Sequence, residues 1–189
     1  MDGILPIWKE KGMTSHDVVN KVRRIFSTKR VGHGGTLDPD VEGVLIVAIG
    51  SGTRVLEYLL EGDKTYAGEI TLGYSTTTED ASGELVEKAD VPEELSIQEI
   101  DEKMKEFVGL IEQTPPLYSA VRVQGHRLYE YARANIPVER PSRKVNIYSF
   151  KRTSYPQRNE EGTVSFCFNV QCGKGTYVRT LAVDLGKKL

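Results

Sequence analysis

The stretch Val164-Ser-Phe-Cys-Phe-Asn-Val-Gln-Cys172 indicates the fold most clearly. Its apolar residues at positions 164, 166, 168 and 170 alternate with polar residues, a period that predicts a strand with one buried face. Lys174-Gly-Thr176 follows, and an apolar stripe at helical spacing comes next, formed by Val178, Leu181, Ala182 and Leu185. We therefore predict a half-buried strand and then an amphipathic helix in which the chain ends at Leu189.

Outward from this pair, the sequence predicts more strands than helices. Strands are expected over residues 4–8, 44–49, 66–72, 118–123 and 145–150, and helices over 53–60 and 128–134. Two capping boxes, Thr14-Ser-His-Asp17 and Ser96 with Glu99, predict two further helix starts. Four glycines and a proline between Val31 and Gly43 predict an irregular loop. Strands joined by short turns favour an α+β fold, with a mainly antiparallel mixed sheet flanked by helices and loops, over a doubly wound sheet.

Length and composition limit the organisation of the chain. A chain of 189 residues fits one domain, 1–189, with a sizeable core. No apolar run approaches the roughly 20 residues that a membrane span needs, and the first residues lack the layout of a secretory signal. The two cysteines, Cys167 and Cys172, suit neither a disulfide framework nor a zinc site. We therefore expect a cytoplasmic protein without a metal.

Charge is distributed unevenly along the sequence. Residues 78–112 contain twelve acidic and three basic residues, a net charge of −9. Because the whole chain carries −2, the remaining residues carry +7. The basic residues cluster at 21–30, 122–143 and 144–152. Such asymmetry can supply a basic face for phosphates while an acidic segment faces elsewhere; two solvated surfaces of opposite sign are the alternative.

The loop Gly32-His-Gly-Gly-Thr-Leu-Asp-Pro39 is the best candidate for a functional site. Its glycines allow the backbone to approach a ligand closely, and Pro39 restricts the conformation of Asp38. The spacing matches neither a phosphate-binding loop nor a dinucleotide-binding loop. A plain Asp-Pro turn is the simpler alternative, and Asp40 and Glu42 are competing acids in the same region.

Arg179 is the second unusual feature, because it falls in the first turn of the predicted last helix. The helix macrodipole disfavours a cation there by some tenths of a kcal/mol. An anionic partner would remove this objection, either a phosphate or a carboxylate such as Asp38. A solvated arginine is the alternative.

Together these stretches resemble the tRNA pseudouridine synthase B family, whose signature is a GHxGxLDP loop that bears one catalytic aspartate. The resemblance covers essentially the whole chain. It includes Lys11-Gly-Met-Thr-Ser-His16, Lys64-Thr-Tyr66, Thr76-Thr-Thr-Glu-Asp80, Pro115-Pro-Leu-Tyr-Ser-Ala120, Leu128-Tyr-Glu-Tyr-Ala132 and Lys174 to Arg179. One departure lies near the start, where Trp8-Lys9-Glu10 replaces the family's usual Asp-Lys-Pro.

The resemblance implies a base-flipping isomerase that converts uridine to pseudouridine in the T loop of tRNA, at position 55, without a cofactor or metal. It implies that Asp38 is the nucleophile and that Arg179 pairs with it as a second catalytic residue. Tyr66, also a candidate for proton handling, and Tyr177 would line the uracil pocket.

Two further residues and the partners also follow from the resemblance. His33 would help to open the tRNA loop around the extruded base, and Asp80 is a further candidate for substrate binding as well as a competing acid. The expected partner is the T stem-loop of tRNA, with no obligatory protein partner and no membrane. The family also has a remaining piece of catalytic domain and a C-terminal RNA-binding PUA-like domain, which we expect to be absent from this chain and whose absence would weaken tRNA binding.

Three alternatives remain open from the residues. One is a guide-RNA-dependent uridine isomerase of a larger ribonucleoprotein, which shares the aspartate loop. Another is an RNA-binding module whose catalytic loop is vestigial. The third is a retaining glycosidase, which would need a carboxylate pair about 5–5.5 Å apart, such as Asp38 with Asp40 or Glu42.

The uneven charge yields a prediction for RNA binding. We expect affinity for tRNA to fall steeply with salt although the sequence pI is about 6.0, because each neutralised phosphate contributes a slope near −0.9 in duplex regions. Filter binding across a salt series would measure this slope. A flat dependence would mean that the basic residues share no common face.

Overall fold

The computed structural model describes residues 1–189, which form two units, Met1–Gly62 and Asp63–Leu189. The first unit is built on a three-stranded sheet in the order β1-β3-β2. In it, β1 (Gly3–Lys9) pairs over its whole length with β3 (Gly43–Ile49), and β2 (Val31–His33) pairs with the last part of β3. The expected single catalytic domain over 1–189 stays a prediction.

One helix packs against the sheet of the first unit. α1 (Ser15–Ile25) begins after Thr14, whose hydroxyl accepts a hydrogen bond from the Asp17 amide at 3.1 Å, while the Asp17 carboxylate accepts one from the Thr14 amide at 2.9 Å. This arrangement confirms the predicted capping box. The core of the unit consists of Val18, Val19, Val22, Val31, Leu45, Val47 and Ile49. A short 3-10 helix η1 (Gly50–Val55) and α2 (Leu56–Glu61) follow β3, where one helix was predicted.

The central strand of the second unit is β12 (Val164–Cys172), the strand predicted from its alternation. β4 (Lys64–Leu72) pairs with it over its whole length, while β10 (Arg143–Arg152) and the short β11 (Gln157–Arg158) also pair with it. β7 (Gly109–Gln113) in turn pairs with β10. Every strand pairing in the chain is antiparallel, which confirms the predicted α+β class.

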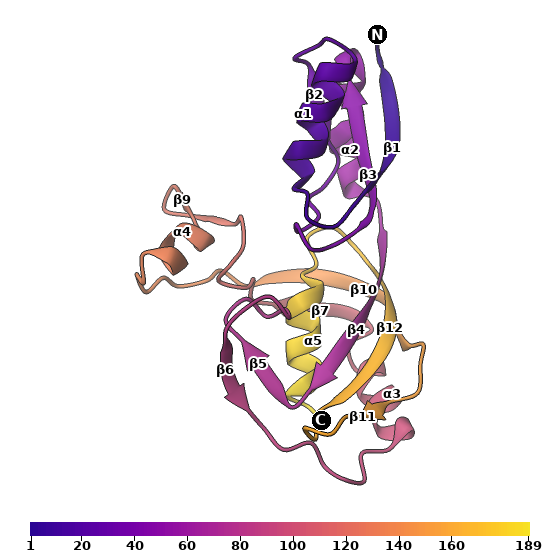
Figure 1. The fold of residues 1–189 in the computed structure, drawn as a ribbon, viewed down its shortest axis with the longest axis vertical. Coiled ribbons are helices and arrows are strands. Elements are labelled where there is room, and N and C mark those ends of the chain that lie inside the picture. The colour runs from indigo at the N-terminus through magenta and orange to yellow at the C-terminus, as the bar shows by residue number, and fades with distance from the viewer. The chain divides into compact units, whose positions relative to one another are not determined.

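The apolar face of β12 forms the core of the second unit, and two helices cover it. Alternate residues of β12 point to the same face, and those at 164, 166, 168 and 170 are at most 5% exposed. α3 (Ile97–Lys105) and α5 (Val178–Gly186) pack on this face; Figure 1 draws α5 in yellow beside β4. Their contributions to the core are Ile100, Met104, Leu181 and Leu185.

Two small hairpins complete the second unit. β5 (Tyr74–Thr76) and β6 (Leu85–Lys88) enclose the loop that contains Asp80. β8 (Arg122–Val123) and β9 (His126–Arg127) lead into α4 (Leu128–Arg133). The acidic segment 78–112 therefore contains β6, α3 and most of β7. No helix has the length and apolar character needed to cross a membrane.

The predicted strand over 118–123 is wrong, because only Arg122–Val123 is a strand there. The carbonyls of Ser119 and Val121 accept hydrogen bonds from the amides of Tyr129 and Leu128, at the start of α4, instead of from a neighbouring strand. The strand β7 was not predicted. Its adjacent apolar residues, Leu110 and Ile111, face opposite sides, so the segment shows no clear alternation.

Two other predicted boundaries are also wrong. Residues 31–33, inside the predicted irregular loop, form β2, because Val31 pairs with Ile49 at the edge of the sheet. The last helix ends at Gly186, three residues before Leu189, with Lys187 as its cap. Glycine has a low helix propensity, which favours this end point.

Packing against β12 predicts a specific stability effect. Leu185→Ala should lower the free energy of unfolding by about 2–5 kcal/mol, because Leu185 is fully buried and the truncation leaves a cavity. Denaturant unfolding would measure the change. The matched control is Leu110→Ala, since Leu110 is 61% exposed, and its effect should stay within about 0.5 kcal/mol. Equal losses for both variants would contradict the assigned core.

Candidate active site

Asp38 lies in a loop of the first unit whose far end is tied to the start of the chain. The carbonyl of Pro39 accepts a hydrogen bond from the Gly12 amide at 2.9 Å. It also accepts one from the ammonium of Lys9 at 3.1 Å. The same ammonium donates to the carbonyls of Met13 at 2.7 Å and Glu10 at 3.0 Å. Lys9 is fully buried, so its ammonium donates hydrogen bonds to the backbone and not to solvent.

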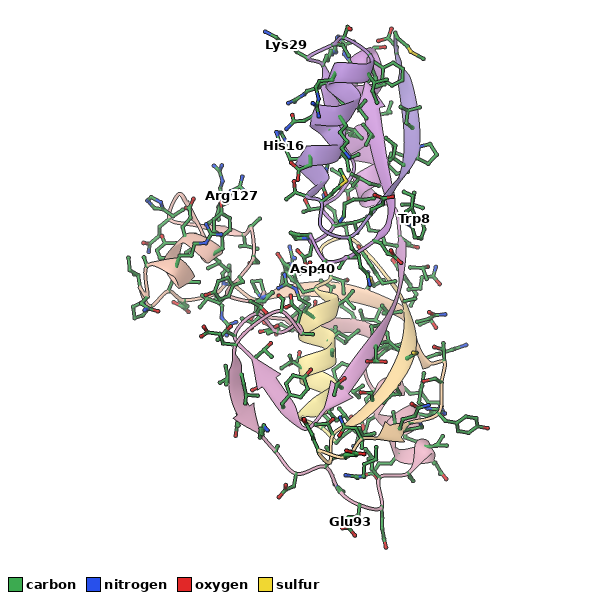
Figure 2. The ribbon with its side chains drawn as sticks, viewed as in Figure 1. Trp8, His16, Lys29, Asp40, Glu93 and Arg127 are labelled. Atoms are coloured by element: carbon green, nitrogen blue, oxygen red, sulfur yellow. The ribbon has the colours of Figure 1, made fainter.

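The residue before Asp38 is held in the same way. Ser15, the first residue of α1, donates from its hydroxyl to the Leu37 carbonyl at 3.2 Å and accepts from the Leu37 amide at 3.0 Å. The Asp38 carbonyl itself accepts a bond from the Val41 amide at 3.1 Å. Both chain neighbours of Asp38 are therefore fixed, which restricts the direction of its carboxylate. Figure 2 labels Asp40, an exposed residue two positions further along.

His33 stands at the other end of this loop. It belongs to β2, opposite Val47, and its Nδ1 contacts the carbonyl of Gly35. Gly35 has φ +124°, a backbone conformation that favours glycine. The Gly34 amide donates to the Ile46 carbonyl at 2.7 Å, which closes the loop onto β3. His33 and Asp38 thus occupy opposite ends of one constrained loop.

The other predicted site residues lie in the second unit. Tyr66 is on β4 opposite Val170, and its half-buried ring packs against the core. Tyr177 is the residue that precedes α5, and Arg179 lies in the first turn of that helix. The predicted pairing of Arg179 with Asp38, and the predicted uracil pocket of Tyr66 and Tyr177, stay predictions, because Asp38 belongs to the first unit.

Arg179 has a carboxylate partner within its own unit. Its guanidinium donates to the carbonyls of Thr78 at 2.8 Å and Tyr118 at 3.2 Å, and it lies 3.4 Å from Oδ2 of Asp80. The anion that the helix-dipole argument requires is therefore supplied by Asp80 in this unit. Asp80 was predicted as a substrate-binding residue, a role that stays a prediction.

Asp80 is held as an anion by hydrogen bonds. Burial alone would raise the pKa of its carboxyl, but hydrogen bonds from Ser82 and Thr78 and the charge of Arg179 outweigh burial and lower that pKa below its ordinary value. The Thr78 hydroxyl donates to Oδ1 at 2.7 Å, and the Ser82 hydroxyl and amide donate at 2.6 and 3.0 Å. A full negative charge therefore stands beside Arg179 at neutral pH.

The loop that carries Asp80 is also fastened to α5. Glu79 has φ +61°, unusual for a residue other than glycine, and its carboxylate accepts a hydrogen bond of 2.7 Å from the Thr180 hydroxyl. Successive residues of the loop and of the helix thus bind each other in pairs, Asp80 with Arg179 and Glu79 with Thr180. This pairing could not be predicted from the sequence, because it joins positions about a hundred residues apart.

No group of three or more His, Cys, Asp or Glu side chains could hold a metal ion, and Cys167 and Cys172 are both free thiols.

The buried ammonium of Lys9 provides a test of how the Asp38 loop is held. Lys9→Met keeps much of the aliphatic stem but removes the ammonium bonds to three carbonyls, of which that of Pro39 keeps the Gly12 amide, so the free energy of unfolding should fall by about 1–3 kcal/mol. Amide hydrogen exchange at Leu37 and Gly12 should accelerate. The control is Lys11→Met, an exposed lysine two positions away. If exchange at Leu37 is the same in both variants, Lys9 does not hold the loop.

Comparison with known proteins assigns the family. The family model described as TruB family pseudouridylate synthase (N terminal domain) matches residues 23–178. The tRNA pseudouridine synthase B of Streptococcus pyogenes serotype M3 is 58% identical over 189 residues, which cover 100% of this chain and 64% of that protein. That of Bacillus pumilus is also 58% identical, with 100% and 61% covered. The chain therefore spans less than two thirds of the length of these curated relatives.

Solved structures are also similar to this chain, at lower identity. A crystal structure of a Cbf5-Nop10-Gar1 complex contains a chain that is 33% identical, with a TM-score of 0.70 over 99% of this chain and 44% of that one. A structure of an H/ACA RNP bound to a substrate RNA containing 2'-deoxyuridine matches at 29% identity and a TM-score of 0.66, over 99% and 43% of the two chains. Because the family model matches most of this chain, residues 23–178, the chain belongs to the TruB family of pseudouridylate synthases.

Proposed function

We propose that this chain is the catalytic part of an enzyme that isomerises uridine to pseudouridine in the T loop of tRNA. The observation that carries the proposal is the constrained loop around Asp38, in which Ser15 and Lys9 hold the residues on either side. A single carboxylate with a restricted orientation suits a reaction in which one group either forms a covalent bond to the substrate or stabilises a developing charge. The relatives named tRNA pseudouridine synthase B support the substrate class.

The proposed reaction needs no redox partner. The bond from C1′ to N1 breaks, the uracil turns, and a bond from C1′ to C5 forms, while C5 loses its proton and N1 gains one. Ionised Asp38 can attack C1′, attack C6, or stabilise the sugar cation as the uracil leaves. Each of these routes uses the carboxylate as an anion, and in this proposal the guanidinium of Arg179 is its cationic partner.

The uridine must leave the folded tRNA loop before it can react. Extrusion costs a few kcal/mol, and stacking on Tyr66 recovers about 1–3 kcal/mol. In this proposal Tyr177 is the second wall of the uracil pocket, and Tyr66 also handles a proton. His33 helps to open the tRNA loop around the extruded base.

A basic, aromatic segment of the second unit is our candidate for tRNA binding. The guanidinium carbons of Arg127 and Arg133 lie 5.9 and 5.2 Å from the centre of the Tyr129 ring. Figure 2 labels Arg127 on this segment, and its side chain is exposed. Arginine with an aromatic ring can bind both phosphates and unstacked bases. We propose a cytoplasmic location for the protein, because its proposed substrate is tRNA.

Guide-RNA-dependent isomerisation is the second candidate function, favoured by the likeness to the chain in the Cbf5-Nop10-Gar1 complex. In that structure the similar chain is part of a complex with other proteins. We propose that the present chain acts on the T stem-loop without an obligatory protein partner. Activity on bare tRNA with this chain as the sole protein separates the two candidates.

Replacement of the proposed nucleophile is the main test. Asp38→Asn should abolish isomerisation and leave RNA affinity within a few-fold, because asparagine keeps the shape of the side chain without its charge. The assay is tritium release from tRNA labelled at uracil C5. Turnover within about tenfold of wild type, which is about 1.4 kcal/mol of barrier, would overturn the assignment of Asp38.

The control for this test is Asp40→Asn, which removes an exposed carboxylate from the same loop. It should keep most of the activity. Release of free uracil by wild type would instead indicate a glycosidase, and loss of activity only in Asp40→Asn would move the chemistry to that residue.

A further inference from the structure

Gln113 has a buried side-chain amide, and both of its hydrogen bonds go to the backbone of Tyr177. It is the last residue of β7, is 1% exposed, and bonds to both backbone groups of Tyr177. Its Oε1 accepts from the Tyr177 amide at 3.0 Å, and its Nε2 donates to the Tyr177 carbonyl at 3.1 Å. This side chain therefore imitates a strand partner for a single residue, 64 positions further along the chain.

The position of Tyr177 explains why its backbone needs the two hydrogen bonds from Gln113. Tyr177 has extended backbone angles immediately before α5 and no side-chain cap. The turn before it includes Gly175 at φ +82°, and the Thr176 hydroxyl donates to the Gly173 carbonyl at 2.9 Å. Without Gln113, the Tyr177 amide would lose its hydrogen-bond acceptor, whereas the Tyr177 carbonyl would still accept from the Leu181 amide at 3.1 Å. The junction between the turn and the helix would then be held by one bond fewer on each side of Tyr177.

The ring of Tyr177 is held from a neighbouring position. Arg143 on β10 is the partner of Gln113 across the antiparallel ladder, and its guanidinium carbon lies 4.5 Å from the centre of the Tyr177 ring. A Cβ atom at Gly175 would come within 3.1 Å of this guanidinium, so the glycine leaves room for it. The buried Nε of Arg143 has no hydrogen-bond partner, which fits a guanidinium placed for contact with the ring.

We propose that Gln113 and Arg143, one rung of the β7–β10 ladder, are positioning residues for Tyr177. Gln113 fixes the backbone of Tyr177, and Arg143 fixes the plane of its ring. The inference rests on the proposed function, in which Tyr177 is a wall of the uracil pocket. A displaced wall misaligns the extruded base, and a misplacement of about 1 Å can cost on the order of 10²-fold in rate.

A double-mutant cycle tests whether Gln113 acts through the ring. Gln113→Met keeps the length of the side chain but removes both hydrogen bonds, and it should lower kcat about 10–10²-fold in the wild-type background. In the Tyr177→Ala background the same change should alter kcat by no more than about twofold, because no ring is left to position. A merely structural role would lower kcat by the same factor in both backgrounds, and that result would overturn the proposal.

The matched control is Gln157→Met, an exposed glutamine on β11. It should leave kcat within about twofold in both backgrounds. If Gln113→Met does not fold, the cycle is run with Arg143→Met, which removes the guanidinium from the ring and keeps both Gln113 bonds. Additive losses in that cycle would equally overturn the proposal.

A spectroscopic measurement separates this inference from the proposed function. With ring-labelled tyrosine, the Tyr177 resonance is assigned by its disappearance in Tyr177→Phe. It should shift or broaden in Gln113→Met and Arg143→Met, and stay unchanged in Gln157→Met. If wild type isomerises no uridine, the proposed function fails while this resonance still decides the positioning. An unchanged Tyr177 resonance in both positioning variants would overturn the inference whatever the activity.

Discussion

A lysine ammonium buried among three backbone carbonyls is the interaction on which the Asp38 loop depends. Lys9 ends β1 inside the first unit, and its donors reach Glu10, Met13 and the carbonyl that follows Asp38. Burying a charge is costly unless it is fully hydrogen-bonded. Here the bonds offset that cost, and they tie the loop to the start of the chain. The departure at Trp8-Lys9-Glu10 from the family's usual Asp-Lys-Pro leaves this lysine in place.

The second unit uses polar side chains in the same manner. Gln113 binds the backbone of Tyr177, Arg179 binds the carbonyls of Thr78 and Tyr118, and Thr180 binds Glu79. Each contact joins a predicted site residue, or its immediate neighbour, to a distant segment. Such contacts hold side chains within the small tolerance that catalysis demands. The ionised state of Asp80 has the same origin, because hydrogen bonds from its own loop and the charge of Arg179 keep the pKa of the carboxyl low.

Sequence patterns predicted the elements whose period is strong. The alternation in β12, the capping box of Thr14 and the stripe of α5 all match the structure. The segment 118–123 failed, since its carbonyls bond to the start of α4 and not to a strand. Within the site, motif resemblance identified Asp38, Tyr66, Tyr177 and Arg179, whose roles stay predictions. It gave no sign of Gln113, and it included Ser15 in a motif without indicating the bonds of Ser15 to Leu37, because the sequence does not show which distant backbone group a polar side chain contacts.

The α+β class, most of the elements, the family resemblance and the residue types available for chemistry could therefore be predicted from the sequence alone. Local periodicity and short motifs carry that information, since each depends on neighbours within a few positions. The tertiary structure was needed to show that Asp80 is the carboxylate beside Arg179 within the second unit. It was also needed to show that Lys9 donates to the Pro39 carbonyl and that Gln113 and Arg143 contact Tyr177. The members of these pairs lie 30 to 99 residues apart in the sequence. Burial strengthens their hydrogen bonds, and burial exists only once the chain has folded.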